Sequence, residues 1–370
     1  MTDLLYDDVE EALRDSVRAL LTAHAPWRRT LARVDGDEPY DRSLWERLVG
    51  ELGVAGLPVP EEHGGAGAGF REVAVVLEEL GRAVAPVPFL GSAVVATRAL
   101  LSCGDVGLLG RLAAGRCVAA LTVPFAVAPG ARPETVAATD GPLLSGRVAG
   151  VADALPVDVL LVPAGDGLYA VDAREAGVRM TPVVSLDATR PLADIGFSAA
   201  PARRVAAGAT ATRAVTDALT AGAALLASEQ VGVAQRCLDL AVAHVRTRHQ
   251  FGRPVGSFQA VKHRLADVWV EVSQARAVAR HAADCLASGD PDTALAASLA
   301  QAYCGTVAVT AAEVCVQLHG GIGFTWEHPA HLFLKRARST AVAFGTADRH
   351  RAVLAGLVDL PAPPPDAPRP

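Results

Sequence analysis

The spacing of apolar residues predicts helices through the first third of the chain. Between residues 7 and 23 the apolar positions share the spacing of one helix face: Val9, Leu13, Val17, Leu20 and Leu21. Ser43 stands where an N-cap is expected for a second helix. A further helix is expected from about Phe70 to Val84, after a glycine-rich loop.

The pattern changes at about residue 118. Short apolar runs replace the long helical stripes, with glycine, proline and aspartate between them. Runs of this kind, at this spacing, are typical of strands in a small antiparallel β domain. We expect strands within 118–123, 157–162, 168–171 and 193–197.

Helical patterns return near residue 210 and are much longer. They cover about 211–248, 257–287 and 292–318, with a shorter one at 346–357. Long helices joined by tight turns predict an antiparallel four-helix bundle. The fold class is therefore α+β, mainly α: an N-terminal α-helical domain (1–117), a middle β domain (118–205), a C-terminal bundle (206–358) and a Pro-rich tail (359–370) without regular structure.

Composition excludes several classes of protein. The net charge of -6, without a long basic block, argues against nucleic-acid binding, which requires a basic face to neutralise phosphates. Six cysteines occur without C-x-x-C spacing, so we expect isolated thiols and no metal site. The N-terminus lacks an apolar leader, and no apolar run approaches the roughly 20 residues of a membrane span. These features predict a cytoplasmic protein that does not bind membranes.

Two segments carry the most specific information. The stretch 248–259 reads Arg-His-Gln-Phe-Gly-Arg-Pro-Val-Gly-Ser-Phe-Gln, and 317–324 reads Gln-Leu-His-Gly-Gly-Ile-Gly-Phe. Together, at this separation, they resemble the cofactor-binding segments of the acyl-CoA dehydrogenase family of flavoproteins. The resemblance extends over almost the whole chain and implies the same helix–sheet–helix order. It also implies that FAD lies between subunits, with these two segments contacting the cofactor of a neighbouring chain.

The resemblance assigns a role to each residue of this half of the site. Arg248 would contact the pyrophosphate, for which a planar, permanently charged guanidinium is well suited. The glycines would let backbone N–H groups approach the adenosine. Taken singly, Gly320-Gly321 could be only a helix C-cap, and Arg248 a solvated cation. The residues assigned to the cofactor are Arg248, Phe251, Phe258, Gln259, Gln317, Gly320 and Gly321.

The half of the pocket that the chain would provide for its own cofactor is less complete. Leu121 and Thr122 match the family's Leu-Thr-Glu-Pro stretch, but Val123 replaces the glutamate and no serine follows in 125–129. No tryptophan occurs between Trp45 and Trp269, although the family places one beside the flavin ring. Thr346, in a Gly-Thr pair near the C-terminus, is the remaining match on this side.

Both positions where the family keeps its catalytic glutamate lack an acid. Removing the α-proton of a thioester requires a carboxylate within hydrogen-bonding reach. One usual position directly precedes the Gly-Thr pair and is Phe344 here; the other falls near Gly222. Glu229 is the nearest acid on the same helix and is a weak candidate for the base. A structural hydrogen bond or an exposed helix charge are the alternatives for Glu229.

Four functions remain open from the sequence. The chain could be the base-lacking subunit of a mixed acyl-CoA dehydrogenase, alongside a related subunit that carries the base. It could be a self-sufficient homo-oligomer with a relocated base such as Glu229. It could perform a changed reaction on the same scaffold, such as oxygenation, cyclisation or dehydration, or it could be a non-enzymatic binding protein. The substrate, and whether its thioester is carried by coenzyme A or by a carrier protein, are not determined by the sequence.

Overall fold

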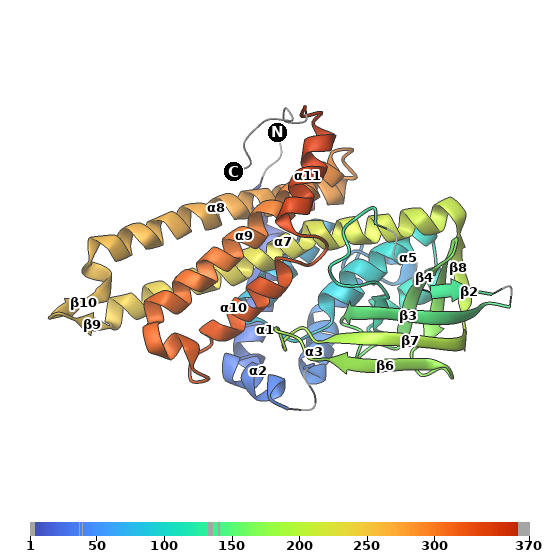
Figure 1. Ribbon diagram of the computed structural model, residues 1–370, viewed down its shortest axis with the longest axis horizontal. Helices are drawn as coiled ribbons and strands as arrows, with labels where there is room; N and C mark the ends of the chain where they lie inside the picture. Colours follow the sequence, from blue (N-terminus) through green and yellow to red (C-terminus); the bar gives the residue numbers. More distant parts are fainter. Residues whose placement is uncertain (1–3, 37, 39, 132–135, 140, 362–370) are drawn as a thin grey trace, which may run out of the picture.

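A computed structural model shows three parts in the predicted order: helices, strands, then long helices (Figure 1). The structure describes residues 4–36, 38, 40–131, 136–139 and 141–361. Most of the Pro-rich tail, 362–370, lies outside the described residues, so its expected lack of regular structure stays a prediction. The mainly helical α+β class with a middle β region is confirmed.

The N-terminal helices begin where capping side chains are available. The Asp7 side chain accepts a hydrogen bond from the backbone N–H of Glu10, and the Glu10 side chain accepts one from the backbone N–H of Asp7, which completes a capping box. The prediction of Ser43 as an N-cap was wrong: Asp41 caps that helix, and the Ser43 hydroxyl donates to Asp41 instead. The helices are α1 (Asp8–His24), α2 (Trp27–Val34), α3 (Arg42–Leu52), α4 (Phe70–Ala83), α5 (Thr97–Cys103) and α6 (Val106–Ala113), with the π-helix η3 (Phe89–Ala96) and short 3-10 turns η1 (Val54–Gly56) and η2 (Glu61–His63).

The middle region contains two four-stranded sheets. Their strand orders are β1-β4-β5-β8 and β2-β3-β7-β6, and one apolar core joins residues of both, including Leu160 and Ile195. The expectation of antiparallel pairing was wrong for β1 and β4, which are parallel. Between them the chain forms β2 and β3, which belong to the other sheet. The strands are β1 (Ala119–Leu121), β2 (Val136–Ala138), β3 (Leu143–Ala152), β4 (Val159–Ala164), β5 (Gly167–Asp172), β6 (Val178–Val183), β7 (Leu192–Pro201) and β8 (Arg203–Ala207).

Three long helices dominate the C-terminal part, and α7 passes through the centre of the molecule (Figure 1). Their predicted positions are confirmed to within a few residues, whereas the sequence reading missed α10. Glycines let α4 and α7 cross closely: a Cβ on Gly232 would lie 1.9 Å from the carbonyl oxygen of Glu78. The elements are α7 (Gly208–Thr247), β9 (His249–Gln250), β10 (Arg253–Pro254), η4 (Val255–Ser257), α8 (Gln259–Ser288), α9 (Thr293–His319), η5 (Gly320–Phe324), α10 (Ala330–Thr340) and α11 (Ala347–Leu357).

Two other expectations can be compared with the structure. The helical stretch Thr293–Phe324 is long and apolar enough to span a membrane by length and composition, so the expectation of no such run was wrong on those criteria. It packs in the bundle, where 67% of its apolar window is buried. All six cysteines are free, and only Cys103 is partly exposed.

Candidate functional site at two ends of the C-terminal helices

The first predicted cofactor segment forms the tip of the bundle, where α7 ends and α8 begins. Phe251 is 91% exposed and has a left-handed backbone with φ of 53°, in the tight turn between β9 and β10. Its ring meets Phe258 edge-on with centroids 6.1 Å apart, and the Arg253 guanidinium lies 3.9 Å from the Phe258 ring centroid. Arg248 and Gln259 are exposed at the two helix ends. This tip therefore presents aromatic and cationic groups to the outside of the chain.

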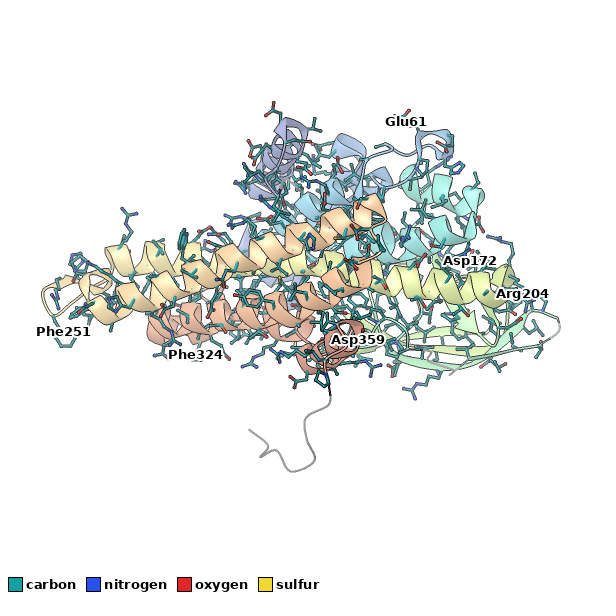
Figure 2. All side chains as sticks on the ribbon, turned by 90° about the horizontal axis from the view of Figure 1, so that it is seen from above. Glu61, Asp172, Arg204, Phe251, Phe324 and Asp359 are labelled. Carbon is teal, nitrogen blue, oxygen red and sulfur yellow. The ribbon has the colours of Figure 1, made fainter. Side chains whose placement is uncertain are left out.

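The second segment lies at the same end of the bundle. The ring of His319 stacks on that of His244, with centroids 4.3 Å apart, and so joins the end of α9 to the last turn of α7. Gln317, Gly320 and Gly321 are exposed beside it, and Gly320 has the positive φ (62°) that glycine tolerates best. Figure 2 shows Phe251 and Phe324 toward the end of the molecule that lies opposite Arg204 of the β region.

Three polar side chains of the predicted cofactor segments make no direct polar contact in the described part of the chain. Among the described residues, nothing forms a hydrogen bond or an ion pair with the side chains of Arg248, Gln259 or Gln317. The predicted residues of this half lie at the same end of the bundle, and all of them are exposed except Phe258, which is half-buried against Phe251 and Arg253. An exposed guanidinium with neighbouring aromatic rings is suited to a phosphate attached to an aromatic group.

A second site lies where the three parts of the chain meet. A small cavity of about 30 Å³ is lined by residues of η3, β1, β3 and the segment before α11, including Leu90, Leu121, Phe125, Asp153 and Phe344. Leu121, predicted from the Leu-Thr pair, therefore faces the cavity.

The neighbouring Thr122 hydroxyl is a candidate ligand group. Its Oγ1 is buried and has no hydrogen-bond partner among the described residues. An unpaired buried hydroxyl is costly unless another molecule bonds to it. Thr346 is placed differently: it is exposed and caps α11 by accepting from the N–H of Arg349.

The two positions that lack the expected acid contact each other, and one of them, Phe344, lines this cavity. A Cβ placed on Gly222 would lie 2.6 Å from Cζ of the Phe344 ring, which is closer than real side chains approach. The Phe344 ring is buried (4% exposed) and packs edge-on against Phe125, with centroids 5.6 Å apart. One aromatic ring therefore fills the space that a side chain at position 222 would enter.

The backbone holds this ring firmly. Phe344 has φ of 53°, an unfavourable conformation for a large side chain. Its N–H donates to the carbonyl of Phe125 at 2.8 Å, and its carbonyl accepts from His350 Nε2 at 3.0 Å. Bonds on both sides of the residue fix the ring between Gly222 and Phe125.

Glu229 lies in a buried ion-pair network and not in the lining of this cavity. Both its oxygens contact Arg190 (3.0 and 2.6 Å), and Oε1 also accepts from Arg336 at 2.9 Å. Burial raises the pKa of this carboxyl, but the two guanidinium groups outweigh it and lower the pKa to about 2. A carboxylate held so strongly ionised is a poor acceptor for an α-proton at neutral pH.

Asp153 is the carboxylate that the sequence reading missed. It lines the cavity, is buried and has φ of 56°. Its oxygens accept from Tyr40 Oη and from the N–H of Gly91, each at 2.9 Å. Burial raises the pKa of Asp153, although Arg190 acts in the opposite direction. Only the left-handed backbone and the long-range contacts reveal this placement, and neither can be read from the sequence.

Comparisons with known proteins agree with this geometry. Residues 7–106 match the family model described as the acyl-CoA dehydrogenase N-terminal domain, and 212–357 match the one described as the C-terminal domain. A curated relative, acyl-CoA dehydrogenase IpdE2 of Mycolicibacterium smegmatis, is 39% identical over 336 residues, which cover 90% of this chain and 94% of the relative. The chain belongs to the acyl-CoA dehydrogenase family.

Two similar solved structures are each named for a pair of proteins. One is a variant of the Tcur3481-Tcur3483 steroid ACAD, with TM-score 0.86, 30% identity and coverage of 95% of this chain and 98% of that one. The other is the ChsE4-ChsE5 complex from Mycobacterium tuberculosis, with TM-score 0.87, 28% identity and coverage of 98% and 100%.

FAD is the cofactor of acyl-CoA dehydrogenases, and the two sites of this chain fit it unequally. The bundle tip offers a free guanidinium, two free amides and exposed glycines, which suit the phosphates and the adenosine. At the domain junction, the unpaired Thr122 hydroxyl is a suitable donor to the flavin ring. The cavity beside it is small and lined mainly by apolar groups.

Proposed function

We propose that this chain is the base-lacking subunit of a mixed acyl-CoA dehydrogenase oligomer. In this assembly a related chain provides the catalytic carboxylate for α,β-dehydrogenation of an acyl thioester. This chain contributes Arg248, Gln259, Gln317 and the Gly320-Gly321 turn to FAD seated mainly on that partner. When bound, FAD supplies the acceptor for the hydride that leaves the β-carbon.

One observation carries the proposal: the Phe344 ring fills the space beside Gly222 where both usual base positions converge. A missing base typically costs a factor of about 10²–10⁴ in rate. Here the carboxylate is absent and an apolar ring occupies the space. By contrast, the surface that serves a neighbour's cofactor keeps its polar groups, all exposed and unpaired within the described chain.

The solved complexes support a mixed assembly and a substrate class. ChsE4-ChsE5 and Tcur3481-Tcur3483 are described as pairs of chains, and the latter as a steroid ACAD. We propose a ring-containing acyl group as the substrate, carried as its coenzyme A thioester, and the cytoplasm as the location.

Spectroscopy and co-expression test this function. The chain expressed alone should bind little flavin. Co-expression with a related chain that has glutamate before its Gly-Thr pair should yield a yellow complex that dehydrogenates an acyl-CoA. Arg248→Gln in this chain should lower the FAD content of the complex, while Arg213→Gln, at an exposed arginine of the same helix, should leave it unchanged. Stoichiometric FAD and turnover by the chain alone would contradict the proposal.

A self-sufficient enzyme is the second candidate, and one observation favours it. Asp153 places a carboxylate with a raised pKa in the lining of the junction cavity, next to Phe344. If the purified chain alone oxidises an acyl-CoA, Asp153→Asn should abolish turnover, whereas Glu229→Gln should act mainly through stability. Unchanged turnover in Asp153→Asn would exclude Asp153 as the base.

A further inference from the structure

A second cationic feature lies where α1, α4, α7 and α10 meet. A groove of about 380 Å³ opens there, and its walls include Arg18, Arg82, Arg236, Glu79, Trp27 and Phe333. We call it the arginine groove. Its lining residues come from helices of the N-terminal part and from helices of the C-terminal part.

The carboxylates at the arginine groove are already engaged. Glu79 accepts two hydrogen bonds from Arg18, at 2.9 and 2.6 Å, in the fork geometry typical of an arginine–carboxylate pair. Arg82 donates to Oδ2 of Asp239 at 3.0 Å, and the other oxygen of Asp239 accepts from the Gln235 amide at 2.8 Å. Neither acid forms a hydrogen bond or an ion pair with Arg236 within the part of the chain that the structure describes.

Arg236 is the third arginine of the groove, and it differs from Arg18 and Arg82 in having no acidic partner within the described residues. It is half-buried in the wall of the groove and makes no hydrogen bond or ion pair with any residue that the structure describes. Burial lowers its pKa and the nearby charge of Arg82 lowers it further, while the charge of Asp239 acts in the opposite direction. A half-buried guanidinium without an acceptor in the described chain can form charge-assisted hydrogen bonds with an anion that enters the groove.

The walls indicate which anion fits. Guanidinium groups recognise phosphate by paired, parallel hydrogen bonds, and Arg236 has its donors free. Trp27 and Phe333 add apolar and aromatic surface, and the groove is much larger than one phosphate group requires. We propose that the arginine groove binds a phosphate group, with Arg236 as its principal ligand, and that the apolar walls contact the organic part of a phosphate ester. This inference does not rest on the proposed function.

Calorimetric titration of the full chain, or of its complex with a partner, tests the proposal at low ionic strength. The probes are inorganic phosphate and phenyl phosphate, with chloride as the reference anion. The exposed guanidinium and aromatic rings of the bundle tip could also bind phenyl phosphate, so the variants below are needed to assign the binding to the arginine groove. Both probes should bind saturably. Tighter binding of phenyl phosphate identifies an organic phosphate as the ligand class, and equal binding identifies free phosphate.

Variants connect the binding to Arg236. Arg236→Gln should weaken binding of both probes by about tenfold or more, the loss expected for charge-assisted hydrogen bonds. Arg236→Lys keeps the charge but loses the fork, so its loss should be smaller; it also serves if the glutamine variant does not fold. Arg213→Gln, at an exposed arginine on the same helix, should bind like the unmodified protein. Absence of saturable binding, or equal losses in Arg213→Gln and Arg236→Gln, would overturn the proposal.

Discussion

The bundle tip and the domain junction are the two regions that we propose as flavin contacts in this family, and they differ in almost every physical property. At the tip, the side chains of Arg248, Gln259 and Gln317 are exposed and have no partner among the described residues. At the junction, Phe344 is buried against Phe125 and Gly222, and Glu229 is enclosed by two arginines. The polar side chains of the tip are available to bind another molecule, whereas the charged side chains of the junction form ion pairs with one another and stabilise the fold. The contrast favours a chain that serves a neighbour's cofactor.

The largest effect is expected at the buried ion pairs of the junction. Glu229→Gln leaves Arg190 and Arg336 without their shared carboxylate, and breaking a buried pair in this way typically costs about 3–5 kcal/mol of unfolding free energy. Chemical denaturation followed by circular dichroism measures it. The control is Glu313→Gln, because Glu313 pairs with Arg338 at the surface and its loss should cost below about 1 kcal/mol. Similar costs for both variants would show that the junction is not a structural core.

The same carboxylate predicts an acid dependence of stability. The folded pKa of Glu229, about 2, lies below its ordinary value of 4.5. Ionised Glu229 therefore stabilises the folded state above about pH 4.5, and this contribution is lost as the pH falls from 4.5 toward 2. The shift corresponds to a contribution on the order of 3 kcal/mol. In Glu229→Gln the unfolding free energy should fall less steeply over this range than in the unmodified chain.

The tip should show the opposite behaviour. Arg248→Gln removes an exposed side chain without intrachain bonds, so the unfolding free energy of the chain should change by less than about 0.5 kcal/mol. In a complex with a flavin-carrying partner, the same change should weaken FAD binding by about 1.5–3 kcal/mol, which is roughly ten- to a hundredfold. Flavin release followed by fluorescence measures it. A destabilised chain with normal FAD binding would reverse the assignment of the two regions.

The sequence predicted the tip better than the junction, and the reason is physical. The tip residues lie within two short segments, and exposure follows from their placement at helix ends and turns. The junction depends on contacts between distant residues: Arg190 follows β6, Glu229 is on α7 and Arg336 is on α10, an element that the apolar pattern did not reveal. The sequence identified Gly222 and Phe344 as the two positions without an acid. It did not indicate that the ring of Phe344 fills the space next to Gly222.

The contact between Gly222 and Phe344 predicts a coupled pair of substitutions. Gly222→Ala should destabilise the protein by about 1–3 kcal/mol, because the new methyl group would overlap the Phe344 ring. In a Phe344→Leu background the methyl group meets a smaller side chain, so its cost should fall. A double-mutant cycle measured by denaturation gives the coupling. Costs that simply add would show that the ring does not occupy this space.

The smallest effect discriminates most directly between the two regions, because its sign depends on where the cofactor lies. Thr122 Oγ1 is buried without a partner among the described residues, and Thr122→Val replaces the hydroxyl by a methyl group of similar shape. If the junction of this chain holds no flavin, the variant should be as stable as the unmodified protein or more stable, by up to about 1 kcal/mol. If the junction does hold flavin, the lost hydrogen bond should lower both flavin content and melting temperature. A Thr122→Val chain that is stabilised and equally poor in flavin is the result expected of a subunit that serves its neighbour's cofactor.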